Sequence, residues 1–154
     1  FNYQDADQWF SVDNVSLLVD SVNPCSARFG PPPVPDGGGA STALGGTRMT
    51  TSGDVIEVTW DAASCTAGEY NLIYGDLAGV SSYALSGSEC AIGASGTFTW
   101  SAVPAGDLYF LIVGTDGSGV ESSWGSNSFI GERNGMAASG QCSTTAKDIT
   151  TSCP

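Results

Sequence analysis

The sequence predicts an all-β protein in which roughly six or seven short strands pack as a sandwich with Greek-key connections. Two observations carry this prediction. Apolar and polar residues alternate over several short segments, which is the pattern of strands with one buried face. Gly accounts for 21 of the 154 residues and charged residues for only 13%, a composition that favours strands and tight turns over helices.

The predicted strands follow one another closely along the chain. In residues 54–60, Ile56, Val58 and Trp60 share one face. Residues 69–77 repeat this alternation. The other candidate strands are residues 47–51, 80–87, 96–100, 106–117 and 120–125. The pattern is weakest in 80–87. No segment shows the apolar repeat of a helix.

The stretch 106–117 is the most apolar of these strands. Its alternation assigns one row of side chains to the core: Tyr109, Leu111 and Val113. The other row then faces outward: Leu108, Phe110 and Ile112. An exposed apolar row of this size needs a cover. The second row is therefore predicted to form an interface.

Prolines and glycines divide the chain. The run PPPVPDGGG at residues 31–39 favours a stiff extended segment followed by a looser one. It predicts a linker over residues 25–40, between an opening fragment (1–24) and a β-domain (41–130). Residues 131–154 lie outside the strand pattern and are predicted to form a separate, disulfide-closed tail.

Two stretches of the β-domain resemble a fibronectin type III module: VTW in residues 58–60 and VPAGDLYFLIVGTDGSG in 103–119. Val103, Pro104 and Tyr109 match the apolar residue, the proline and the corner tyrosine of that family. The resemblance implies a fibronectin type III or immunoglobulin-like sandwich over 41–130. The run from WDAASC to the end is similar to C-terminal modules of bacterial secreted multidomain proteins, which implies an accessory role without a defined activity.

The opening stretch WFSVDNVSL resembles the closing strands of a jelly-roll domain of the carbohydrate-binding or adhesion kind. Its buried row is predicted to be Phe10, Val12, Val15 and Leu17. The earlier strands of such a domain are predicted to lie outside this chain. The opening strands would therefore pair with another copy of the chain or with a missing upstream segment. Head-to-tail pairing of this kind gives an open filament.

The charge balance excludes several classes of function. Sixteen acidic residues against four basic ones give a formal net charge of −12, and His is absent. Such a surface repels nucleic acid, because the affinity of a protein for nucleic acid depends on its Lys and Arg residues. No apolar run is long enough to span a bilayer. Without His, the commonest general base and the usual catalytic triads are missing. The sequence therefore predicts a protein that is not an enzyme.

The cysteines indicate an oxidising compartment, because none of the five lies in a CxxC pair typical of zinc or thioredoxin-like sites. Their positions at the ends of predicted segments lead us to predict the disulfides Cys65–Cys90 and Cys142–Cys153. Cys25 is then left as a free thiol or with a partner elsewhere. The predicted location is extracellular, secreted or on the cell surface.

The opening fragment also carries a candidate cation site. Asp13 lies in its closing strand, and Asp5 and Asp7 lie in the preceding turn. In jelly-roll domains of the kind named above, an acid at this place often binds a structural calcium ion. The resemblance therefore implies a Ca²⁺ site at Asp13, Asp5 and Asp7. Calcium takes about six to eight oxygen ligands, so solvated turn residues are the competing interpretation. No other cofactor is predicted.

Together these observations predict a non-catalytic extracellular module with a structural or adhesive role, which self-assembles by strand exchange into a filament or surface layer. The alternative is a carbohydrate-binding or accessory C-terminal module of a secreted hydrolase, with glycans as partners. That alternative needs an exposed aromatic platform. Trp9, Trp100 and Trp124 are its candidates, and packing in the core is the competing interpretation of each.

Overall fold

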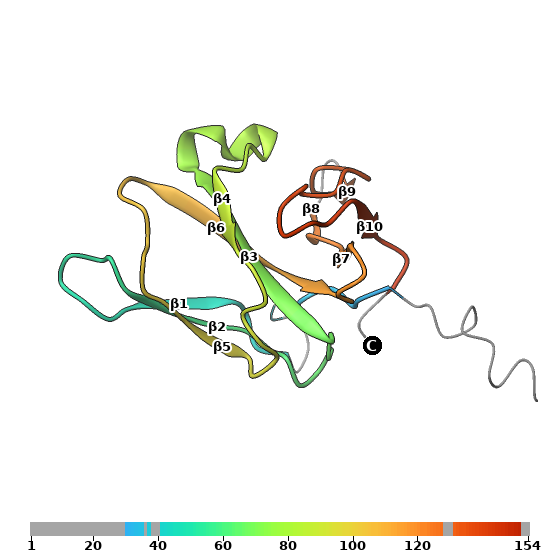
Figure 1. The fold of residues 1–154 in the computed structure, drawn as a ribbon, viewed down its shortest axis with the longest axis horizontal. Helices are drawn as coiled ribbons and strands as arrows, with labels where there is room; N and C mark the ends of the chain where they lie inside the picture. Colours follow the sequence, from blue (N-terminus) through green and yellow to red (C-terminus); the bar gives the residue numbers. More distant parts are fainter. Residues whose placement is uncertain (1–29, 36, 38–40, 128–130, 152–154) are drawn as a thin grey trace, which may run out of the picture.

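The computed structural model describes residues 30–35, 37, 41–127 and 131–151, which form an all-β fold (Figure 1). One antiparallel sheet has the order β1-β2-β5: β1 (Gly45–Arg48), β2 (Ile56–Thr59) and β5 (Thr97–Trp100). A second sheet has the order β10-β7-β6-β3-β4: β3 (Glu69–Asp76), β4 (Gly87–Glu89), β6 (Leu108–Thr115), β7 (Val120–Ser122) and β10 (Ala146–Asp148). The remaining elements are η1, a 3-10 helix (Leu77–Ser82), and the hairpin of β8 (Ser126–Asn127) and β9 (Gly131–Glu132). No helix in the described part of the chain has the length and apolar character needed to cross a membrane.

The two larger sheets enclose the main hydrophobic core. Leu72 on β3 is fully buried, and Trp100 on β5 is 1% exposed. Tyr70 packs against Trp60 with ring centroids 5.3 Å apart, and its hydroxyl donates to the backbone oxygen of Cys65 at 2.8 Å. The core faces predicted from alternation in β2 and β3 are therefore confirmed.

The orientation predicted for β6 is wrong. Ile112 is 5% exposed and belongs to the main core, and Leu108 and Phe110 pack against that core. Val113, on the other face, forms a second cluster with Ile73 and Trp124. Both faces of the five-stranded sheet are covered, so alternation along β6 could not show which face meets the other sheet. The row Leu108, Phe110 and Ile112 therefore faces the main core.

The weak strand predicted at 80–87 is replaced by η1 and the short strand β4. Tyr83 ends η1 in the left-handed conformation, with φ 53°. The chain then passes so close to β3 that a Cβ at Gly75 would collide with the backbone oxygen of Ala84. Tyr109 at the start of β6 fixes this loop, because its hydroxyl donates to Ala84 O at 2.8 Å.

The C-terminal residues 131–151, called the tail below, are part of the fold. Strand β10 pairs in parallel with β7, and Lys147 lies opposite Glu121. This extends the five-stranded sheet at its edge, beyond the end predicted for the β-domain. The tail thus differs from the separate segment that the sequence predicted. A three-residue strand such as β10 carries too little alternation to be recognised in advance.

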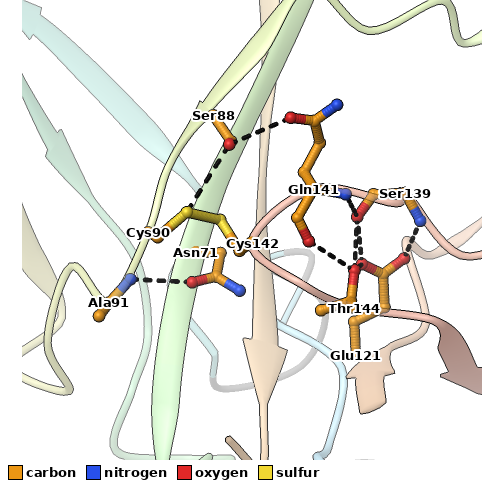
Figure 2. The surroundings of a disulfide bond; sticks show 9 residues. All are labelled: Asn71, Ser88, Cys90, Ala91, Glu121, Ser139, Gln141, Cys142 and Thr144. Carbon is orange, nitrogen blue, oxygen red and sulfur yellow. Dashed lines mark hydrogen bonds between the residues drawn. A yellow bond between two sulfur atoms is a disulfide. The ribbon is translucent and has the colours of Figure 1, made fainter. Parts of the chain in front are cut away.

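The disulfide connectivity also differs from the prediction. Cys90, directly after β4, is bonded to Cys142 in the tail, with Cα atoms 5.5 Å apart (Figure 2). The predicted pairs Cys65–Cys90 and Cys142–Cys153 are therefore wrong, and Cys65 is bonded to another cysteine. The reason is the fold of the tail, which returns across the sheet and brings Cys142 next to Cys90.

The proline-rich run 31–35 has no regular secondary structure, but it does not act as a free spacer. Pro31 and Pro35 are buried, and Val34 packs against the main core. The N–H of Gly30 donates to the carboxylate of Asp148 in β10, and a Cβ at Gly30 would collide with that side chain. The chain therefore enters and leaves the described body at one place, which we call the base.

Asp148 is expected to stabilise this base near neutral pH and to lose that effect in acid. Burial raises its pKa, but hydrogen bonds from Thr150, Thr151 and the Gly30 N–H outweigh burial and lower the pKa to about 2. A lowered pKa stabilises the fold above the unfolded value of about 3.9, and this stabilisation fades as the pH falls towards the folded value. We expect Asp148→Asn to lower the melting temperature at about pH 6 and to have almost no effect near pH 2. Thermal unfolding followed by circular dichroism measures both values, and an equal loss at both would contradict this role.

Candidate functional site

A buried polar cluster lies between the five-stranded sheet and the tail. Its centre is Glu121 on β7, which is fully buried. The indole N–H of Trp124 and the backbone N–H of Ser139 donate to Glu121 Oε1 at 2.8 and 2.7 Å. The hydroxyls of Ser139 and Thr144 donate to Oε2 at 2.5 and 2.8 Å. A buried carboxylate costs free energy unless such donors surround it, so the three bonds from Ser139 and Thr144 hold the tail in one arrangement.

Lys147 on β10 forms the second half of this cluster. Its side chain is fully buried, and Nζ donates to Glu132 Oε1 at 3.3 Å and to the backbone oxygens of Arg133 and Gly135 at 2.8 and 3.1 Å. Nζ also lies 4.2 Å from the ring centre of Trp124. Burial lowers the pKa of Lys147, and Glu132 opposes this shift. Every proton of the ammonium group has an acceptor, so the arrangement is that of a structural cation.

Sequence reasoning did not find this cluster. Glu121, Glu132 and Lys147 look like the solvated charges of an ordinary surface, because such residues are rarely buried. No spacing rule links positions that meet only when the tail folds back. The one sequence feature that could have drawn attention to Lys147 was the scarcity of basic residues, of which the whole chain has four.

A cleft of about 430 Å³ opens at the other end of the molecule. We call it the distal cleft. Its apolar surface comes from Ile56, Trp100, Leu108 and Phe110, which belong to both sheets. Leu77 lies at its rim and is 49% exposed. The cleft exists because the two sheets diverge here, while the loops 49–55 and 101–107 project past their ends (Figure 1).

The rim of the distal cleft carries charges of both signs. Asp54 accepts hydrogen bonds from Ser52 Oγ and Thr50 Oγ1 at 2.5 and 2.6 Å, both on Oδ1. These bonds lower the pKa of Asp54, so its carboxylate is ionised. Arg48 and Asp107 are exposed, and neither side chain has a hydrogen bond or ion pair within the described residues. Both charges are therefore available to a ligand.

The distal cleft lies opposite the base. In Figure 1 the segment 30–35 meets the sheet near β7 and β10, while the loops that frame the cleft lie at the far end of the sheets. The base and the distal cleft therefore lie at opposite ends of the described body.

The structure places the predicted site residues as follows. Leu108 and Phe110 line the distal cleft, whereas Ile112 is buried in the core. Trp100 and Trp124 are 1% and 4% exposed, so neither offers an open face for stacking. Core packing is therefore the correct interpretation of both.

The other predicted positions lie outside the described residues: Asp5, Asp7, Phe10, Val12, Asp13, Val15, Leu17, Trp9, Cys25 and Cys153. The calcium site and the opening interface stay predictions. Across residues 30–35, 37, 41–127 and 131–151, no group of three or more Cys, Asp or Glu side chains is placed to hold a metal ion.

Comparison of the chain with protein-family models, with curated proteins and with solved structures finds no match. The role of the chain has to be inferred from the chemistry of its surface. The polar cluster under the tail is closed and fully paired. The distal cleft is open and carries unpaired charges, which makes it the better candidate for binding.

Proposed function

We propose that the chain is a non-catalytic, extracellular structural and adhesive module that presents its distal cleft to a partner. The position of the cleft carries this proposal, because it opens at the end opposite the base. The Cys90–Cys142 disulfide is compatible with an oxidising compartment. The net charge of −12 keeps such a module soluble and away from nucleic acid.

A fibronectin type III-like sandwich remains our proposal for the fold type. The packing of a three-stranded antiparallel sheet against a larger sheet supports it. The bond from Tyr109 reaches back 25 residues to Ala84, whereas the corner tyrosine of immunoglobulin-like sandwiches bonds to the backbone a few residues upstream. The parallel strand β10 is an addition to that plan. Self-assembly by strand exchange through residues 1–20 also stays a proposal, since those residues lie outside the described part.

Carbohydrate binding is the second candidate, and one observation favours it. Arg48, Asp54 and Asp107 line the distal cleft together with the half-buried Phe110. The hydroxyl groups of a neutral sugar donate to carboxylates and accept from a guanidinium, so such a ligand satisfies all three charges. An acidic glycan would be repelled by the two carboxylates.

The test is to screen the whole chain against a neutral-glycan array and a random peptide library in parallel. Ala105 is exposed and lines the distal cleft, so Ala105→Trp should fill it without disturbing the core. Ala137, also exposed, lies in the tail, and Ala137→Trp is the matched control. We expect ligands that bind the wild type and the control but lose at least about tenfold affinity for Ala105→Trp. Glycan hits would favour the second candidate. Equal binding to all three proteins, or to none, would overturn the cleft as the binding surface.

A further inference from the structure

Strand β5 forms one margin of the three-stranded sheet (Figure 1), and no described strand pairs with its outer side. The N–H of Trp60 donates to Gly96 O at 2.9 Å, which fixes how β2 and β5 exchange their hydrogen bonds. From Gly96 onward, every second residue therefore directs its backbone groups to β2. Thr97 and Thr99 lie between these residues, so their N–H and C=O groups point outward. Both threonines are exposed.

The outward groups of β5 are open to another strand. Thr97 O accepts from Ser95 Oγ at 3.0 Å. The N–H groups of Thr97 and Thr99 and the C=O of Thr99 have no partner among the described residues. Proteins usually blunt such an edge with a charge, a proline or a bulge. Strand β5 has none of these devices, because it pairs with β2 residue for residue and reads Thr-Phe-Thr-Trp.

The lack of charge sets β5 apart from the other edges. The remaining edge strands of the two larger sheets carry Arg48 (β1), Glu89 (β4), and Lys147 and Asp148 (β10). Residues 90–106, which contain β5, are the longest stretch of the chain without a charged residue. Two copies with a net charge of −12 each repel one another over most of their surface. They repel least where this stretch of one copy faces the same stretch of the other.

Two acidic residues near β5 leave this edge available. Glu57 lies opposite Thr99, but it belongs to β2, one strand back from the edge. Glu89 belongs to the other sheet, and its Oε1 accepts from the indole N–H of Trp100 at 3.2 Å. If two copies pair through β5, both β5 strands separate the two Glu57 residues. Strand spacing then puts them about 14 Å apart, beyond the screening length of about 8 Å at physiological ionic strength.

We propose that two copies of the chain pair through β5 as a closed dimer with two-fold symmetry. Antiparallel β5 strands centred on Phe98 place Thr97 of one copy opposite Thr99 of the second copy, and the outward N–H and C=O groups of these residues bond to one another. Their exposed side chains form cross-strand Thr–Thr pairs. Because both copies use the same patch, the contact closes on itself. This dimer goes beyond the proposed function, since it uses neither the distal cleft nor residues 1–20.

Sedimentation equilibrium of the whole chain with intact disulfides, over a series of protein concentrations, tests the dimer. We expect the measured mass to rise with concentration from that of one chain to that of two, and no higher. The mass of one chain at every concentration would overturn the proposal. A continuing series of larger species would also overturn it, because that is the result of head-to-tail assembly.

The matched variants are Thr99→Lys and Thr47→Lys. Both threonines are exposed and lie opposite Glu57, Thr47 from β1 and Thr99 from β5. Each variant therefore places the same cation beside the same acid, but only Thr99→Lys places it at the proposed contact. We expect Thr99→Lys to weaken dimerisation at least about tenfold and Thr47→Lys to leave it nearly unchanged. Equal effects of the two variants would contradict β5 as the contact.

Hydrogen exchange tests the same contact without any variant. Exchange of the Thr97 and Thr99 amides should slow as the protein concentration rises, whereas the Phe98 and Trp100 amides, which bond to β2, stay protected at every concentration. Equally fast exchange of the two threonine amides at all concentrations would overturn the proposal. Ala105→Trp in the distal cleft should leave the dimer intact, so failure here and failure of the proposed function can be told apart.

Discussion

Replacing Lys147 by Met is expected to lower the free energy of unfolding by about 3–5 kcal/mol, the usual cost of breaking a buried ion pair from one side. Met has nearly the same length but cannot donate. Glu132 then loses its cation, and the backbone carbonyls of Arg133 and Gly135 lose their donor. Urea denaturation followed by tryptophan fluorescence measures this loss, because Trp124 lies directly under Nζ.

Arg48→Met is the control for that experiment. Arg48 is the exposed cation of the distal cleft, and its side chain has no ion pair within the described residues. Its replacement should change the free energy of unfolding by no more than about 0.5 kcal/mol. If Lys147→Met costs as little as Arg48→Met, Lys147 is not buried against Glu132 and the tail is not held by this cluster.

The second large effect is expected from removing the disulfide. The double variant Cys90→Ser/Cys142→Ser should lower the free energy of unfolding by about 2–4 kcal/mol. The bond joins positions 52 residues apart, so its loss gives the unfolded chain more freedom. Chemical reduction is a poorer test, because Cys65 is also disulfide-bonded. Hydrogen exchange should become faster in residues 139–145 of the variant, whereas β3 and β6 keep their protection until global unfolding. A variant as stable as the wild type would contradict this role.

The strands of the central sheet could be predicted from the sequence because their alternation is long. Strands β3 and β6 each span eight residues, and both lie within predicted segments. Strand β10 could not be predicted, because its three residues place a buried Lys147 between Ala146 and Asp148 and show no apolar alternation. The side of β6 that meets the main core was also predicted wrongly. Trp124, Tyr83 and Leu85 cover the other side, and nothing in the sequence indicated that cover.

The distal cleft was beyond sequence reasoning because its residues come from separate segments. It combines Arg48, Leu77, Trp100 and Asp107, which only the packing of two sheets brings together. The predicted cysteine pairing was wrong for a similar reason. Cys142 and Cys153 are close along the chain, but the fold places Cys142 beside Cys90.

The central claim is that the tail belongs to the sheet, because both the base and the open cleft opposite it depend on this arrangement. Peptide mapping of the native protein under non-reducing conditions tests it most directly. The result we predict is one linked pair of peptides that contains Cys90 and Cys142, with no linked pair containing Cys65 and Cys90. Recovery of Cys142 bonded to Cys153 would instead place the tail apart from the sheet and contradict the account.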